Sequence, residues 1–268
     1  MHDCKAKDMV EITSLQNPLV KRIRFLKKRK HRLREGCFWA EGIRNALQAL
    51  ELGWDIEALV WVPDMLRSDP ALQAVQRASV RKVAVSRYVF EGMAVGENPQ
   101  GLGALVRLRE QRLADLDAGS ETLLVVLEEP RNRGNVGTVV RTVDCAGGDG
   151  VVLLGRSVDA YDPESVRASM GSLFAMPVVA CPGVSDFVAW AGDRGLRLVG
   201  TSARATQSYR EVSYRRPLAL LFGNERKGLS GMLRAAADEV VRIPVLGRAT
   251  SLNLASAVAV MAYQAVEG

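Results

Sequence analysis

The chain lacks the long apolar run that a membrane helix needs. None of its hydrophobic stretches approaches the roughly 18 consecutive apolar residues of a membrane-spanning helix. The first segment, MHDCKAKDMVEITS, has no apolar centre and does not resemble a secretory signal. These two absences predict a cytoplasmic protein whose 268 residues fold into ordinary hydrophobic cores, as one large or two modest domains.

Histidine and cysteine are both scarce. The candidates for a metal site are two histidines and four widely spaced cysteines: His2, His31, Cys4, Cys37, Cys145 and Cys181. They form no C-x-x-C pair, so we expect reduced, mostly buried thiols and no metal site. H-E-x-x-H and G-x-S-x-G are also missing, which argues against metallohydrolase, protease and esterase functions.

Acidic residues are absent from one strongly basic segment. From Lys21 to Arg34 the sequence KRIRFLKKRKHRLR has nine Lys or Arg residues, whereas the rest of the chain has 27 basic and 30 acidic residues. Apolar residues at helical spacing predict one helix from Asn17 to Leu33, with Asn17 as its cap and Pro18 in its first turn. The helix would present Arg22, Lys28, Arg29 and Arg32 to solvent. The simpler interpretation is a face that only keeps the protein in solution, but a surface this free of acids favours contact with RNA.

Secondary-structure patterns divide the chain into two α/β domains. Residues 1–108 read as a small alternating unit, residues 109–121 as a polar linker, and residues 122–268 as apolar strands alternating with helices. The second pattern predicts a mostly parallel sheet covered on both faces. Ligands of such sheets bind at the carboxyl ends of the strands.

Three marked stretches follow predicted strands of the second domain. They are NVGTVVRT from Asn135, LFGNERKGLS from Leu221, and IPVLGRATSLNLAS from Ile243. In the last stretch we expect a helix that begins at Leu252 and is capped by Ser251. The second stretch has the G-x-x-x-x-G frame of a phosphate loop, but Leu229 stands where that loop needs lysine, which disfavours a nucleotide hydrolase. No G-x-G-x-x-G supports a dinucleotide site.

In their order and spacing these stretches resemble the SpoU (TrmH-type) ribose methyltransferases of the SPOUT superfamily. The resemblance covers residues 122–268. The first domain is similar to the L30e-like RNA-binding domain that often precedes the catalytic domain, and Glu41-Gly42 and Asn98–Gly101 fit that pattern. The resemblance implies a SPOUT α/β fold with a C-terminal trefoil knot, S-adenosyl-L-methionine as cofactor, an RNA substrate and a homodimer formed through the C-terminal domain.

The resemblance also implies roles for individual residues. The family's catalytic arginine falls on Arg141. Its other motif residues fall on Asn135, which shapes the loop or binds RNA, on Glu225, which orients Arg141 or the substrate, and on Ser251 and Asn253. A guanidinium with a pKa above about 12 is a poor base, so we favour an electrostatic role for Arg141 beside the reacting ribose.

The implied cofactor site lies in the last loops of the chain. Backbone groups of Gly223, Ile243 and Leu252 would hold S-adenosylmethionine, and the side chains that line the pocket would be those of Leu221, Asn224 and Thr201. Arg133 stands where the family often has proline, and its charge would face the RNA.

We therefore expect an RNA 2′-O-ribose methyltransferase. Ribosomal RNA is favoured over transfer RNA because the first domain resembles an L30e-like module, which is an argument by analogy. A non-catalytic RNA-binding factor in ribosome assembly is the alternative from another class. Binding of the cofactor separates the two.

Overall fold

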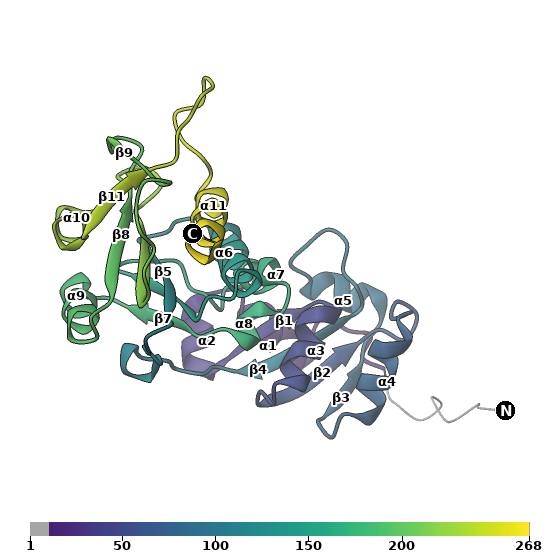
Figure 1. Ribbon diagram of the computed structural model, residues 1–268. Helices are drawn as coiled ribbons and strands as arrows, with labels where there is room; N and C mark the ends of the chain where they lie inside the picture. The colour runs from purple at the N-terminus through teal and green to yellow at the C-terminus, as the bar shows by residue number, and fades with distance from the viewer. Residues whose placement is uncertain (1–10, 268) are drawn as a thin grey trace. The chain divides into compact units, whose positions relative to one another are not determined.

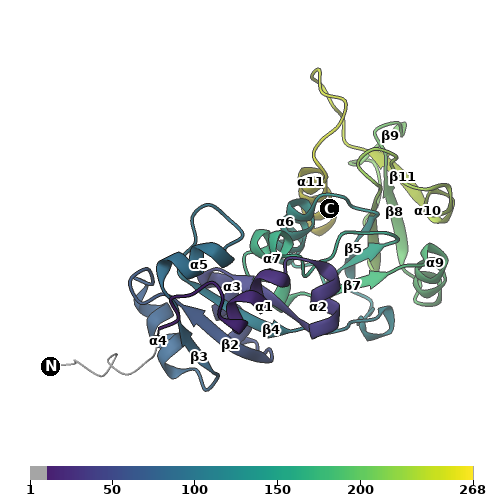
Figure 2. The same ribbon diagram turned by 180° about the vertical axis from the view of Figure 1, so that it is seen from behind.

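The computed structural model describes residues 11–267, so His2 and Cys4 lie outside the described residues. The described chain forms two units (Figures 1 and 2). The first comprises residues up to Leu108 together with Tyr161–Phe174, and the second comprises Arg109–Ala160 and the residues from Ala175 onward. The fourteen-residue segment from Tyr161 thus belongs to the first unit, although the sequence places it inside the second domain.

The first unit is built on a four-stranded sheet in the order β1-β4-β2-β3. Strands β1 and β2 are antiparallel to β4, and β3 is parallel to β2. The strands are β1 (Cys37–Glu41), β2 (Ile56–Trp61), β3 (Lys82–Ala84) and β4 (Leu102–Arg107). The helices are α1 (Pro18–Phe25), α2 (Arg29–Glu35), α3 (Ile43–Glu51), α4 (Asp69–Arg77), α5 (Arg87–Met93), α7 (Pro163–Ser169) and α8 (Ser172–Ala175).

An aromatic cluster explains why the segment from Tyr161 joins the first unit. The rings of Tyr161 and Phe38 have centroids 4.8 Å apart, and those of Phe174 and Trp54 are 5.2 Å apart. The indole N–H of Trp54 donates to the carbonyl oxygen of Phe174 at 3.0 Å. Burying such rings supplies much of the hydrophobic stabilisation of a small core. These contacts join residues more than 100 positions apart, which is why the linear pattern does not reveal them.

The basic segment forms two helices, and not the single helix expected. The cap at Asn17 is confirmed, since its side-chain oxygen accepts from the N–H of Leu19 at 2.9 Å. Helix α1 ends at Phe25, and α2 begins at Arg29 after a short turn. The turn resets the helical phase, so Leu33 is 62% exposed whereas Arg32 is only 1% exposed. The expectation that Arg32 faces solvent is therefore wrong.

Buried Arg32 caps the end of α1. Its Nη1 donates to the carbonyl oxygens of Leu26 at 2.7 Å and Lys27 at 3.1 Å. Its Nη2 lies 3.4 Å from the Oδ2 of Asp162, which precedes α7. A cation satisfies the unpaired carbonyl groups at a helix C-terminus and offsets the negative end of the helix dipole. Arg32 thus ties the segment from Tyr161 to the basic arm.

Replacing Arg32 by alanine should strongly destabilise the first unit. Removing one partner of a buried ion pair typically costs about 3–5 kcal/mol, because the other charge stays buried. Thermal unfolding followed by circular dichroism would measure the loss, with exposed Arg29→Ala as the control, which should change the stability by less than about 0.5 kcal/mol. Equal melting temperatures for the two variants would contradict the structural role of Arg32.

The second unit is built on a seven-stranded sheet in the order β7-β6-β5-β10-β8-β11-β9. Every paired register in it is parallel, so the predicted mostly parallel α/β fold is confirmed. Its strands are β5 (Leu123–Glu128), β6 (Gly150–Leu154), β7 (Val178–Cys181), β8 (Arg197–Thr201), β9 (Gln207–Ser208), β10 (Leu218–Phe222) and β11 (Glu239–Arg242). Its helices are the short η1 (Leu113–Asp115), then α6 (Arg133–Cys145), α9 (Val184–Asp193), α10 (Gly231–Ala236) and α11 (Leu254–Glu267).

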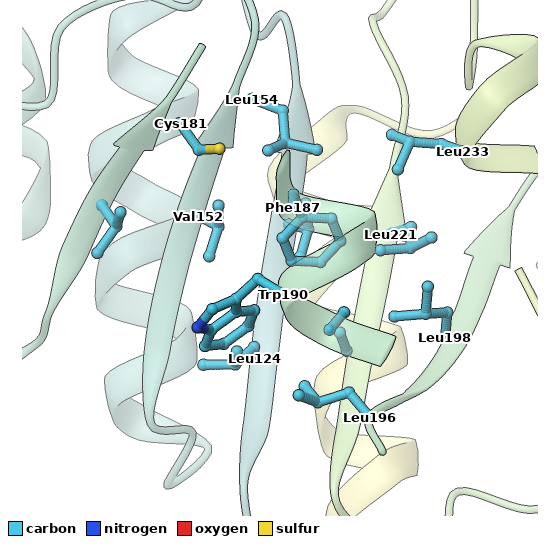
Figure 3. Packing of buried hydrophobic residues seen from close by; sticks show 14 of the residues in the cluster. Leu124, Val152, Leu154, Cys181, Phe187, Trp190, Leu196, Leu198, Leu221 and Leu233 are labelled. Carbon is cyan, nitrogen blue, oxygen red and sulfur yellow. The ribbon is translucent and has the colours of Figure 1, made fainter. Parts of the chain in front are cut away.

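Helices cover both faces of this sheet. In Figure 1, α9 and α10 lie on one face, and α6 and α11 lie on the other. Figure 3 shows the core under α9, where Phe187 and Trp190 pack against Leu124, Val152 and other strand residues. The predicted strands are buried on both faces, as continuous apolar runs such as LLVVL indicate. The threading implied by the resemblance, a trefoil knot, stays a prediction.

The expected linker packs as part of the second unit. The side chain of Leu116 is buried in the core under α9. The side-chain oxygen of Gln111 accepts from the N–H of Val178, at the start of β7, at 2.9 Å. These contacts attach the segment after Arg109 to the edge of the seven-stranded sheet.

Candidate active site

A cavity of about 470 Å³ lies where β8, β10 and β11 end. Loops after parallel strands form its wall, as expected for ligand sites in such sheets. The residues that line it come from four segments and two separate helices: Thr201–Arg204, Phe222–Gly228, residues 241–245 (Val241, Ile243 and Val245), Ser251–Leu254 with Ala257, Asn135 of α6 and Arg234 of α10. All three marked stretches of the sequence therefore contribute to one cavity.

Gly223 begins the tightest of these loops. A Cβ atom at this position would overlap the backbone of Gly228 and Leu229, because the loop folds back onto its own start. Gly228 has a positive φ of 70°, which lets the chain reverse there. The side chain of Leu229 is buried in the core, which accounts for the apolar residue where a phosphate loop would carry lysine.

The buried side chain of Asn224 holds this loop in place. Its Nδ2 donates to the carbonyl oxygen of Glu129 at 2.8 Å. Its Oδ1 accepts from the N–H groups of Arg226 at 3.0 Å and Lys227 at 3.2 Å. Since both ends of the amide are already bonded, Asn224 shapes the cavity wall and leaves backbone groups of the loop to meet a ligand.

Glu225 contacts the start of α6. Each of its carboxylate oxygens lies 3.3 Å from the N–H of Arg131, which precedes the Asn132 cap of that helix. A carboxylate is favoured at a helix N-terminus by the unpaired N–H groups and the helix dipole. Within the described residues Glu225 forms no ion pair with Arg141, and the alternative role, orienting the substrate, stays a prediction. Glu225 positions α6 as a whole.

Asn135 and Asn253 join the first and third marked stretches. The Nδ2 of Asn253 donates to the Oδ1 of Asn135 at 3.1 Å. The Oδ1 of Asn253 also accepts from the N–H of Ala255 at 2.9 Å, which makes Asn253 the N-cap of α11. The predicted cap at Ser251 is wrong, because α11 begins at Leu254, two residues later than expected. Ser251 lines the cavity, as does exposed Leu252.

Of the six residues predicted to hold the cofactor, five line the cavity: Thr201, Gly223, Asn224, Ile243 and Leu252. The exception is Leu221, whose side chain is fully buried in the core of the sheet (Figure 3). The carbonyl oxygen of Leu221 accepts from the hydroxyl of Thr201 at 3.0 Å, so Leu221 supports the cavity wall indirectly, through Thr201.

Arg141 does not line the cavity. It is exposed on α6, six residues after Asn135, which corresponds to about 9 Å along the helix axis. In the described part of the chain its guanidinium forms no ion pair and no side-chain hydrogen bond. The group is therefore available to an anion that lies beside the cavity.

Four cations at the cavity were missed by the sequence reasoning. Arg204, Arg226, Lys227 and Arg234 all line it. Arg226 and Lys227 belong to the quoted GNERKG stretch and could have been found there, whereas Arg204 and Arg234 carry no local signal. The resulting positive edge favours a phosphate-bearing substrate.

The residues predicted to contact RNA have different environments. Lys28, Arg29 and Arg133 are exposed. Arg22 is held by carboxylates, with its Nη1 2.6 Å from Glu57 and its Nε 3.2 Å from Glu35. The hydrogen bond to Glu57 raises the pKa of Arg22 further above its ordinary value. Arg22 is therefore part of a structural ion-pair network, and together with Arg32 it is removed from the RNA-contact set.

The described residues contain neither a metal cluster nor a membrane helix. Across residues 11–267, no group of three or more His, Cys, Asp or Glu side chains could hold a metal ion. In that same range, no helix is both long and apolar enough to cross a bilayer. Among the described cysteines, Cys37 and Cys181 are buried free thiols, in line with the expectation that most of the cysteines are buried. Cys145 on α6 is exposed.

Fold and site together define a parallel α/β protein with a ligand-sized cavity at the carboxyl ends of its strands and with cations lining that cavity. The family model described as the SpoU rRNA Methylase family matches residues 122–263. A second, described as an MRM3-like substrate binding domain, matches residues 17–104.

Full-length relatives agree with these matches. The chain is 32% identical to a 23S rRNA uridine-2′-O-methyltransferase of Streptomyces viridochromogenes, over 90% of this chain and 86% of that protein. It is 28% identical to the 23S rRNA guanosine-2′-O-methyltransferase RlmP of Bacillus subtilis, over 95% and 98% of the two chains. The crystal structure of an AdoMet-bound rRNA methyltransferase from Sinorhizobium meliloti is 36% identical, covers 97% of this chain and 98% of its own, and superposes with a TM-score of 0.86. The chain belongs to the SpoU rRNA methylase family.

Proposed function

We propose that the chain transfers a methyl group from S-adenosylmethionine to a ribose 2′-hydroxyl of ribosomal RNA. The observation that carries this proposal is the meeting of three separate stretches of the chain around one cavity, with Asn253 bonded to Asn135, 118 residues away. The named relatives, which act on 23S rRNA, support ribosomal RNA as the substrate. Such a substrate supports a cytoplasmic location for the protein.

The cavity suits S-adenosylmethionine. Its volume of about 470 Å³ lies within the usual range for small-ligand pockets. Ile243, Val245 and Leu252 offer an apolar wall for a flat base, and the turn from Gly223 to Gly228 offers polar groups beside it. When bound, the cofactor supplies an electrophilic methyl group on its sulfonium sulfur.

The protein's part in the reaction is to place the ribose and favour loss of its proton. Positioning of reactants supplies much of the rate of such transfers. We assign Arg141 to the RNA, where it binds a phosphate and stabilises the negative charge that develops on the 2′-oxygen. Glu225 fixes the start of α6, and the hydrogen bond between Asn135 and Asn253 fixes α6 against α11. We therefore assign all three as positioning residues.

Contacts to RNA are assigned to exposed cations. We retain Lys28, Arg29 and Arg133 from the sequence and add the cavity-edge residues Arg226 and Lys227. Each phosphate that is neutralised releases counterions, so affinity for RNA should fall with rising salt. A salt-independent affinity in a filter-binding titration would contradict this assignment.

We also infer a homodimer formed through the second unit. Helix α11 leaves Val260, Tyr263 and Val266 exposed at a spacing of three residues, and Leu246 in the preceding loop is 97% exposed. An apolar stripe of this kind on a helix is normally covered. Sedimentation equilibrium should give a dimer for the native chain and a monomer for Tyr263→Glu. A monomeric native chain would overturn the inference.

Methyl transfer to two unmodified RNAs tests the proposed substrate. Labelled S-adenosylmethionine would be incubated with the protein and either ribosomal RNA or bulk transfer RNA, side by side. The proposal expects label in ribosomal RNA. Label confined to transfer RNA would keep the enzyme and overturn the substrate, whereas absence of cofactor binding would support the RNA-binding assembly factor instead.

A further inference from the structure

The first unit carries an exposed pair of stacked rings on its basic arm. Phe25, the last residue of α1, is 52% exposed. Its ring lies against the imidazole of His31 in α2, with centroids 5.2 Å apart and planes inclined by 26°. The turn that separates the two helices brings these rings together. One face of the phenyl ring is thus supported by a flat partner, while much of the remaining ring meets solvent.

Positive charge surrounds the pair. Arg24, Lys28 and Lys30 are exposed, and within residues 11–267 no carboxylate lies within ion-pair distance of them. Elsewhere in this unit the exposed Arg87 is paired, with its Nε 2.9 Å from a carboxylate oxygen of Glu91. Unpaired cations around an apolar ring are unfavourable for packing against another apolar surface, and they complement a polyanion.

The surroundings of His31 favour the neutral form of its imidazole. Burial of the ring, followed by the charges of Arg34, Lys30 and Lys28, lowers its pKa from the ordinary value. Its Nδ1 is buried without a hydrogen-bond partner among the described residues. A neutral ring adds no further repulsion among the cations and packs on the phenyl ring as a flat, weakly polar surface.

We propose that Phe25, supported by His31, is a stacking platform for an unpaired base of the RNA substrate, with Lys28 and Lys30 holding the flanking phosphates. Paired bases in an RNA helix hide their faces, whereas bases in loops and bulges stack on aromatic side chains. The inference rests on the proposed function in taking RNA as the substrate. It specifies the recognised element as an unpaired nucleotide.

Binding of two synthetic RNAs to the full-length protein tests the platform. One is a labelled hairpin with a single-stranded loop, and the other is a blunt, fully paired duplex of the same length. Stacking is worth about 5- to 150-fold per base, so Phe25→Ala should weaken hairpin binding by at least about fivefold and leave duplex binding unchanged. Phe25→Trp should restore the affinity. Tyr88→Ala, which removes another exposed ring of this unit beside the Arg87–Glu91 pair, should have no effect.

Three results would overturn the platform. They are unchanged hairpin affinity in Phe25→Ala, an equal loss for hairpin and duplex, and failure of Phe25→Trp to restore binding when circular dichroism shows a native fold. Failure of the methyltransferase proposal would look different. In that case the native chain would bind the hairpin through Phe25 but neither bind S-adenosylmethionine nor methylate ribosomal RNA.

Discussion

Arg141→Ala is expected to lose methyl transfer almost completely while retaining its affinity for S-adenosylmethionine. Removing one preorganised group that stabilises charge in a transition state typically lowers kcat by about 10²- to 10³-fold. The cofactor should still bind, because Arg141 is not among the residues that line the cavity. Single-turnover transfer to ribosomal RNA and equilibrium dialysis of the labelled cofactor measure the two quantities separately.

Arg141→Lys is the matched control for this variant. Lysine keeps the charge but loses the planar, two-pronged contact of a guanidinium with phosphate. We therefore expect a rate between those of the native protein and the alanine variant. Transfer by Arg141→Ala within a few-fold of the native rate would remove Arg141 from the chemistry. A large loss of cofactor affinity would instead assign it to the cavity.

Gly223→Ala is expected to abolish binding of S-adenosylmethionine and to lower the melting temperature. The added Cβ atom would overlap the backbone of Gly228 and Leu229. That backbone has little room to yield, because Asn224 fixes the loop and Leu229 is anchored in the core. Overpacking typically costs about 1–3 kcal/mol, and relief by movement of the loop would deform the cavity wall.

Gly231→Ala provides the control in the same region. A Cβ atom at Gly231 meets no atom within 4 Å, and the residue is the first of helix α10, where alanine is favoured. This variant should bind the cofactor normally and melt no lower than the native protein. Native cofactor affinity in Gly223→Ala, measured by isothermal titration calorimetry, would show that the turn is not part of the cofactor site.

Much of the site could be predicted because its residues follow strands. The apolar runs that became β5, β10 and β11 were readable from the sequence, and the carboxyl ends of parallel strands lie at one edge of a sheet. Gly223, Asn224 and Ile243 therefore line one cavity, although they are distant from Asn135 in the chain. A local pattern and a general rule of topology are therefore sufficient to predict that these residues meet at one site.

Other features depend on contacts that no local pattern encodes. Arg32 was placed on a solvent face because its helix was expected to continue, whereas a turn after α1 rotates it into the protein against Asp162. Glu225 is expected from the sequence to orient Arg141 or the substrate, whereas its carboxylate accepts from the backbone N–H of Arg131. Asn253 takes the cap expected of Ser251 because its side chain also bonds to Asn135. In each case the deciding partner is remote in sequence or lies in the backbone.

The central claim is that the methyl group is placed on a ribose 2′-oxygen. Ribosomal RNA labelled by the native chain would be hydrolysed completely with alkali, which cleaves the backbone only where a free 2′-hydroxyl can attack the adjacent phosphate. The account predicts label in an alkali-resistant dinucleotide. Label released in mononucleotides would place the methyl group on a base and contradict the account.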